Sequence, residues 1–232
     1  KYQFTDSVVA ISSAIKDILT NFNVKNVEII SDAVAAKTLH KKRVEELFLN
    51  NQWYGKKIIA TTAAFVPHKD PLTMVRAIGE LHKLRQDFIF LHFGTGPLAH
   101  KVLHEINTLN ISSCYKIMGF VEDIEDFFSV FDVFAMSSEE EGLGSSVLDA
   151  FIYKVPVATT NAGGLKEIVN ERGMLCQVKD AKQLAKNIDQ LLNDEQLRKQ
   201  LVEKAYQYVI QEHSVEKIAE GYKTLFTGLL GK

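Results

Sequence analysis

Residues 58–97 read IIATTAAFVPHKDPLTMVRAIGELHKLRQDFIFLHFGTGP, and this stretch decides the fold class. Its two apolar runs, Ile58–Thr61 and Phe88–His92, are rich in β-branched and aromatic residues, which is typical of buried strands. Between them, Asp70 and Pro71 have the pattern of a helix N-terminus. An apolar stripe follows at helical spacing: Leu72, Val75, Ile78 and Leu81. The stretch therefore predicts a strand, a helix and a second, parallel strand.

The same alternation continues in both directions along the chain. Further strands are predicted at Val27–Ile30, Tyr115–Met118, Val133–Met136 and Pro156–Thr159. Two further helical stripes consist of Leu98, Val102, Ile106 and Leu109, and of Leu184, Ile188, Leu191 and Leu192. Strands that alternate with helices in this way predict an α/β fold with a doubly wound parallel sheet.

The two ends of the chain have patterns of their own. Asp6–Ser12 is predicted to be a strand and Ser13–Thr20 a helix, and Val215–Leu230 has the apolar spacing of a last helix. Lys37–Asn51 is polar, and we expect a connecting stretch that is partly helical. The chain opens with Lys1 and not with methionine, so we expect a piece of a longer protein.

Composition excludes several classes of protein. Of the 232 residues, 46% are hydrophobic and 24% charged, which fits a globular domain and not a disordered chain. The formal net charge of −2 gives no sign of nucleic-acid binding. Two distant cysteines are too few for a disulfide scaffold or a thiolate metal site, and they fit a reducing compartment. No apolar run is long enough for a membrane span, and the first residues lack the apolar region of a signal peptide.

In a doubly wound sheet, ligands bind beyond the carboxyl ends of the strands, and three loops there have unusual chemistry. The first is Phe93–Pro97, in which Gly94 and Gly96 allow a close approach of the backbone. The alternative interpretation is a tight turn that binds no ligand. A dinucleotide fingerprint needs a further glycine at position 99, which is alanine, so NAD binding is disfavoured.

The second loop, residues 137–146, places three glutamates before a glycine-rich turn and a helix. Free N–H groups at a helix N-terminus bind anions, and Gly142 and Gly144 would let them reach a phosphate. Carboxylates beside such a site suit a ligand that also has hydroxyl groups, and Asp149 could reach a diol from the helix. Alternatively, the glutamates only complement the helix dipole and Asp149 is solvated.

The third loop, residues 65–71, places Lys69 just before the predicted cap Asp70, from where it could reach a phosphate. Simple solvation is the alternative for a single loop lysine. His68 is interpreted as a loop side chain, and we expect no metal site because no His, Cys and Asp residues have metal-ligand spacing.

Several motifs occur together along the chain, from the N-terminus onward: His68–Pro71, Gly94–Pro97, Gly119–Val121, Glu141–Ala150, Pro156–Thr159 and Gly163–Val169. Together they resemble the group 1 family of retaining GT-B glycosyltransferases, over about residues 58–192. Those enzymes have two Rossmann-like domains. The resemblance implies that residues 39–214 are the C-terminal, nucleotide-sugar-binding domain, that residues 1–38 are a remnant of the N-terminal domain with the linker, and that residues 215–232 form a closing helix.

The resemblance also implies roles for particular residues. Lys69 is expected to hold the donor diphosphate and Glu141 to face the transferred sugar, as the two catalytic residues. The other implied donor contacts are, in chain order, the turn Gly94, Thr95 and Gly96, the backbone of Phe120 and Val121 at the base, the loop Gly142, Leu143, Gly144 and Ser145 at the diphosphate, and Asp149 at the ribose hydroxyls.

The sequence departs from the family pattern at three positions. Ala64 stands where an arginine is expected, and Asp149 where a longer glutamate is expected. Both changes predict weaker donor binding, since a lost charged hydrogen bond costs about 1.5–3 kcal/mol. Lys154 replaces a glycine after the donor helix, which predicts either a different helix end or a non-glycine residue with positive φ.

The expected function is therefore donor binding for retaining transfer of a sugar from a UDP- or GDP-linked nucleotide sugar, with no further cofactor. An acceptor glycan, lipid or other sugar would bind to the missing domain, and we expect the fragment alone to be inactive. A cytoplasmic location is expected, with peripheral membrane association of the full-length protein left open. Two alternatives remain: a GT-B phosphorylase or epimerase, and a non-catalytic partner subunit, which Ala64 favours.

Overall fold

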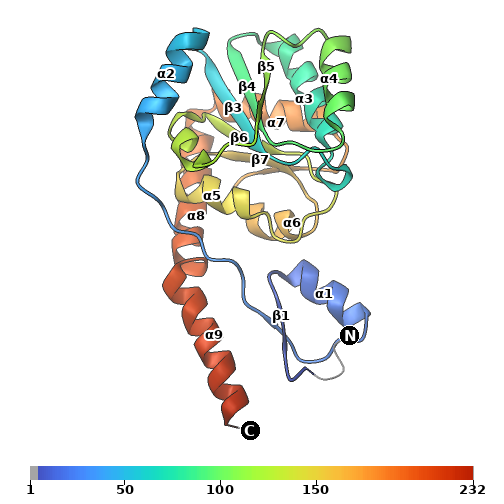
Figure 1. Cartoon of the computed structure of the whole chain (residues 1–232), viewed down its shortest axis with the longest axis vertical. Coiled ribbons are helices and arrows are strands. Elements are labelled where there is room, and N and C mark those ends of the chain that lie inside the picture. The colour runs from blue at the N-terminus through green and yellow to red at the C-terminus, as the bar shows by residue number, and fades with distance from the viewer. Residues whose placement is uncertain (1–4, 232) are drawn as a thin grey trace.

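The computed structural model describes residues 5–231 of the chain, so residues 1–4 of the predicted N-terminal remnant and Lys232 of the predicted last helix lie outside the described residues. Its main sheet has six parallel strands in the order β5-β4-β3-β6-β7-β8 (Figure 1). In chain order these are β3 (Lys57–Thr62), β4 (Phe88–Phe93), β5 (Tyr115–Gly119), β6 (Val133–Met136), β7 (Val157–Thr160) and β8 (Met174–Cys176).

Helices cover both faces of this sheet. One face packs against α3 (Pro71–Leu84), α4 (Ala99–Thr108) and α7 (Ala181–Asn193). The other packs against α2 (Lys41–Asn51), the 3₁₀ segment η2 (Ile124–Val130), α5 (Ser145–Ile152), α6 (Gly164–Val169) and α8 (Glu195–Glu212). A short 3₁₀ segment, η1 (Pro67–Lys69), precedes α3. The two hydrophobic cores on either side of a parallel sheet confirm the predicted doubly wound α/β fold.

The strand order reverses between β3 and β6, which are neighbours in the sheet but are separated by two other strands in the sequence. Chain segments leave such a point toward opposite faces, and in doubly wound folds ligands bind there, beyond the carboxyl ends of the strands. The loops after β3 and β6 are the ones that carry Lys69 and Glu141. The topology therefore brings two of the predicted site residues to one place.

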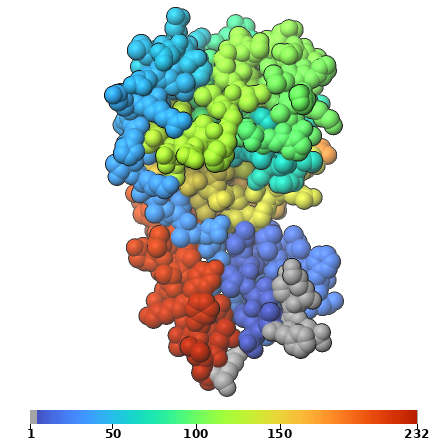
Figure 2. Space-filling view, in the orientation of Figure 1, coloured from blue at the N-terminus to red at the C-terminus, as the bar shows by residue number. Residues whose placement is uncertain are grey.

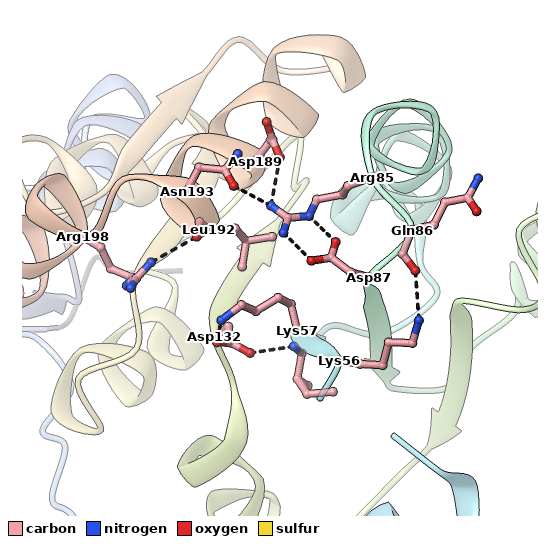
Figure 3. A network of polar contacts seen from close by, with 11 residues as sticks. Lys56, Lys57, Arg85, Gln86, Asp87, Asp132, Asp189, Leu192, Asn193 and Arg198 are labelled. Carbon is pink, nitrogen blue, oxygen red and sulfur yellow. Dashed lines mark hydrogen bonds and ion pairs between the residues drawn. The ribbon is translucent and has the colours of Figure 1, made fainter. Parts of the chain in front are cut away.

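At the amino ends of the strands, a polar network connects strands and helices (Figure 3). Arg85, at the end of α3, donates two hydrogen bonds of 2.7 Å to Asp87, which precedes β4, and one each to Asp189 and Asn193 of α7. Lys57, the first residue of β3, pairs with Asp132 before β6 at 3.2 Å. These contacts join strands and helices at the amino ends, away from the loops of the predicted site.

A smaller unit lies beside the carboxyl edge. It consists of β1 (Val8–Ala10), α1 (Ser13–Asn21) and β2 (Val27–Ile29), and its two strands form a separate parallel sheet. The last helix, α9 (Val215–Leu230), extends away from the main sheet to this unit, as Figure 2 shows by the adjacent blue and red surfaces. An open groove of about 630 Å³ separates α9 from β2. Among residues 5–231, no helix is long and apolar enough to cross a membrane.

Some elements differ from the sequence-based expectations. The strand β8, the segment η2 and the helix α8 were not predicted, and the partly helical stretch at 37–51 contains the regular helix α2. Asp70 caps α3 as predicted, because its carboxylate accepts from the Thr73 N–H at 3.2 Å. Lys154 follows α5 with φ +58°, so the second of the two predicted outcomes, a non-glycine residue with positive φ, is the one adopted.

Candidate functional site

Lys69 and Glu141 form an ion pair at the carboxyl ends of β3 and β6. The Lys69 Nζ lies 2.5 Å from Glu141 Oε2, and both side chains are largely buried. The buried Ser138 donates its hydroxyl to the same carboxylate oxygen at 3.1 Å. A lysine and a glutamate from different loops thus meet where the sheet topology leaves room for a ligand.

The two loops that carry this pair are joined by their backbones. The His68 carbonyl accepts hydrogen bonds from the N–H groups of Glu139 and Glu140, at 2.8 and 3.2 Å. The Ser137 hydroxyl donates to the Asp70 carbonyl at 2.8 Å. His68 therefore acts through its backbone, in agreement with its interpretation as a loop residue. This bonding fixes the position of Lys69 relative to Glu141.

The glycine-rich turn before α5 needs glycine at position 144. Gly144 caps the helix with φ +94°, and a Cβ there would lie 2.5 Å from Leu165 Cδ2 of α6. Val147 and Leu148 donate to the Gly144 carbonyl at 2.8 and 3.4 Å. The preceding N–H groups, those of Ser145 and Ser146, are the ones that a helix start leaves for an outside acceptor. The turn therefore leaves the amides of Ser145 and Ser146 without an acceptor inside the helix.

The Gly94–Gly96 turn packs directly against the loop after β3. A Cβ at Gly94 would lie 2.0 Å from the Ala63 carbonyl oxygen, so no other residue fits there. The Phe65 N–H donates to the Thr95 carbonyl at 3.0 Å, and the Gly94 N–H donates to the Gly119 carbonyl at 2.8 Å. These bonds connect the loops after β3, β4 and β5 into one continuous edge. Ala64, where an arginine was expected, is exposed on it.

A buried histidine bonds the loop after β3 to β5, and it was not identified from the sequence as part of the site. His92 of β4 lies 3.0 Å from the Ala63 carbonyl through Nε2 and 2.6 Å from the Tyr115 hydroxyl through Nδ1. A carbonyl only accepts, so Nε2 carries the proton and Nδ1 accepts from the tyrosine. Burial lowers the pKa of His92 to about 4, which keeps the ring neutral.

The residues predicted at the base and the ribose belong to other elements than Lys69 and Glu141. Phe120 follows β5 with 79% of its surface exposed, and Val121 is half-buried. Asp149 lies in the second turn of α5, and burial raises its pKa to about 6, with a further increase from Glu125 and a decrease from Lys37. A carboxyl group that is costly to ionise is a common feature of functional sites.

The N-terminus of α1 borders the site on the side of the small unit. The Ser12 hydroxyl donates to the Gly142 carbonyl at 2.5 Å, and the Ser13 N–H donates to the Glu167 carboxylate at 3.0 Å. The side chains of Ile11 and Ile15 pack beside Gly142. Gly142 thus lies at the contact between the two units. No group of metal-ligating side chains occurs within the described part of the chain.

Residues 43–208 match the family model described as glycosyl transferases group 1. The chain belongs to this family. The match includes both loops of the Lys69–Glu141 pair and all six strands of the main sheet. It ends inside α8, so the small unit and α9 lie outside it.

Individual relatives agree with this assignment. The chain is 26% identical over 212 residues to N-acetyl-alpha-D-glucosaminyl L-malate synthase of Bacillus anthracis, covering 89% of this chain and 55% of that protein. It is 28% identical over 171 residues to a lipopolysaccharide core biosynthesis glycosyltransferase of Rhizobium meliloti, covering 72% and 49%. This group 1 chain thus spans about half the length of the curated relatives it matches.

A solved structure shows the same fold. Anabaena HepE, crystallised with UDP and glucose, superposes with a TM-score of 0.89 at 18% identity, covering 97% of this chain and 64% of that one. The fold is therefore that of the corresponding part of GT-B glycosyltransferases, as the resemblance implied.

Proposed function

We propose that this chain is the donor-binding part of a glycosyltransferase that moves a sugar from a UDP- or GDP-linked donor to an acceptor, with retention of configuration. The observation that carries the proposal is the ion pair of Lys69 with Glu141, which precedes the first residue of α5 by four positions. Family membership supports the reaction class, and the UDP bound to HepE supports the kind of donor. The acceptor, a glycan, lipid or other sugar, binds to a further domain in this proposal, and the chain alone transfers no sugar.

The proposed mechanism follows from the charges of the site. When the bond between the anomeric carbon and the diphosphate breaks, negative charge grows on the leaving nucleoside diphosphate. Lys69 and the amides of Ser145 and Ser146 stabilise that charge. Glu141 accepts hydrogen bonds from the sugar hydroxyls and orients the ring. Lys69 leaves Glu141 for the diphosphate when the donor binds. The remaining implied donor residues, along the glycine turns and at Phe120, Val121 and Asp149, line the nucleotide.

The domain boundaries and the location of the protein belong to the same proposal. Residues 1–38 are assigned to the N-terminal domain and linker, since β1, α1 and β2 form a sheet apart from the main one. Two free, buried cysteines fit a cytoplasmic protein, because a reducing compartment keeps thiols unpaired. A non-catalytic partner subunit is the second candidate, favoured by the exposed Ala64 in place of a cation.

Calorimetric titration of the chain with UDP and GDP tests the proposal. We expect binding of at least one of them, and Lys69→Ala is expected to weaken it about 10- to 100-fold, since a charged hydrogen bond contributes about 1.5–3 kcal/mol. Lys199→Ala, at an exposed position of α8, is the control and should bind like the wild type. If neither nucleotide binds, or if Lys69→Ala binds as tightly as the control, the proposal is wrong.

A further inference from the structure

The linker between the small unit and α2 is held in place along its length. The Val34 N–H donates to the His213 carbonyl at 2.9 Å, at the junction of α8 and α9. The Lys37 N–H donates to the Tyr153 hydroxyl at 2.9 Å, and the His40 N–H to the Asp126 carboxylate at 2.6 Å. The backbone of the linker, and with it the position of Lys37, is thus fixed against α5 and η2.

Lys37 connects η2 to the end of α5. Its ammonium group forms an ion pair with Glu125 of η2, while its backbone bonds the Tyr153 hydroxyl. The Tyr153 ring in turn stacks on Phe128 of η2, with the ring centroids 5.3 Å apart. The linker therefore crosses the place where η2 and α5 are in contact.

Asp149 shares this place. It lies four residues before Tyr153, so both side chains project from the same face of α5. The charged groups whose fields reach it are Glu125 and Lys37, with opposite effects on its pKa. Lys37 itself also faces Asp123 and Tyr153. Lys37 and Asp149, which are 112 positions apart in the sequence, thus lie in one cluster with Glu125 and Tyr153, where the linker meets η2 and α5.

We propose that Lys37 is a positioning residue for nucleoside recognition, because its ammonium group offsets the charge of Glu125 and so lets Asp149 meet a ribose diol as an ionised carboxylate. This inference rests on the proposed function, in which Asp149 contacts the ribose. An ionised carboxylate accepts from both hydroxyls of a diol, whereas a protonated one loses part of that capacity. Since Lys37 belongs to the linker, a rearrangement of the two units that moves the linker also changes this subsite.

The test compares two ligands that differ only in the diol. The wild-type chain is titrated between pH 5.5 and 8 with whichever of UDP and GDP binds more tightly, and with its 2′,3′-dideoxy analogue. Both ligands carry the same diphosphate, so its protonation cancels in the ratio of the two affinities. We expect the affinity for the nucleotide, divided by the affinity for its dideoxy analogue, to decrease as the pH falls through about 6, where Asp149 takes up a proton.

Two variants should shift this midpoint in opposite directions. Lys37→Met leaves the Glu125 charge uncompensated, so the midpoint should rise by about 0.5–1 pH unit, and the ratio should fall about two- to threefold between pH 6.5 and 7. Glu125→Gln removes the repulsion and should lower the midpoint. Lys37→Arg keeps the charge and should keep the wild-type midpoint. Lys41→Met, at an exposed position of α2, is the matched control.

Three results would overturn the role of Lys37. They are a wild-type affinity ratio that does not depend on pH, midpoints that are unchanged in both variants, and midpoints that shift in the same direction in both variants. If the wild type binds neither nucleotide, the proposed function itself fails, and this inference fails with it. Thermal melting of each variant shows whether it is folded, and Lys37→Arg separates loss of charge from loss of structure.

Discussion

Glu141→Gln in the full-length protein is expected to lower the rate of sugar transfer about 100-fold, which is the cost of a poorly oriented reacting group. The affinity of the Glu141→Gln variant for the free nucleoside diphosphate should stay the same or increase. The reason is the ion pair at 2.5 Å, in which Glu141 competes with a diphosphate for the Lys69 ammonium group. Glutamine keeps the shape of the side chain but removes that competition.

Single-turnover transfer rates and calorimetric titrations with the nucleotide measure the two effects separately. Glu139→Gln is a suitable control, because Glu139 lies in the same loop but pairs with Lys179 at 3.1 Å instead. Loss of nucleotide affinity in Glu141→Gln as large as in Lys69→Ala, or transfer at the wild-type rate, would show that the roles of the two residues are assigned wrongly.

Asp149→Asn is expected to stabilise the protein and to weaken nucleotide binding. The pKa of Asp149 is raised to about 6 by burial, above its value in the unfolded chain, so ionised Asp149 destabilises the native state above that pH. Asparagine removes this cost, and we expect the free energy of unfolding at pH 8 to increase by about 1–3 kcal/mol. The gain should shrink as the pH falls from 6 toward 4, where the wild-type carboxyl group is also neutral.

Urea unfolding at pH 8 and pH 5 measures the change in stability, with Asp17→Asn, at an exposed position of α1, as the matched control. Calorimetry should show affinity for the nucleotide reduced about 10- to 100-fold, and affinity for pyrophosphate unchanged, because pyrophosphate has no ribose. Destabilisation at pH 8, or equal losses for both ligands, would mean that Asp149 serves the fold.

The central strands were predictable because they are buried on both faces, and their sequences are therefore almost entirely apolar. Every residue of Phe88–Phe93 and of Val133–Met136 is buried, and all of them except His92 are apolar, as is typical of a strand with helices on both faces. Met174–Cys176 was missed because three residues at the sheet edge show no pattern. The helix α8 was missed although Leu197, Leu201, Ala205 and Val209 recur at helical spacing, because most of its 18 residues are polar and only Ala205 and Val209 are buried.

The site was predictable at the level of loops and not at the level of contacts. Glycines and a helix cap marked the loops that carry Lys69 and Glu141, but these two residues are 72 positions apart, and only the sheet topology brings them together. Ser138 and His92 gave no signal, because a lone serine or histidine in a sequence does not show what it bonds. The contact of Lys37 with Glu125 depends in the same way on the path of the linker.

We expect the site at the carboxyl ends of β3 and β6 to bind a nucleoside diphosphate through Lys69 and the start of α5. A crystal structure of the chain with UDP tests it most directly. We expect the diphosphate beside the amides of Ser145 and Ser146, with Lys69 Nζ about 2.7–2.9 Å from a phosphate oxygen and no longer paired with Glu141. A diphosphate bound elsewhere, with the Lys69–Glu141 pair still at 2.5 Å, would contradict it.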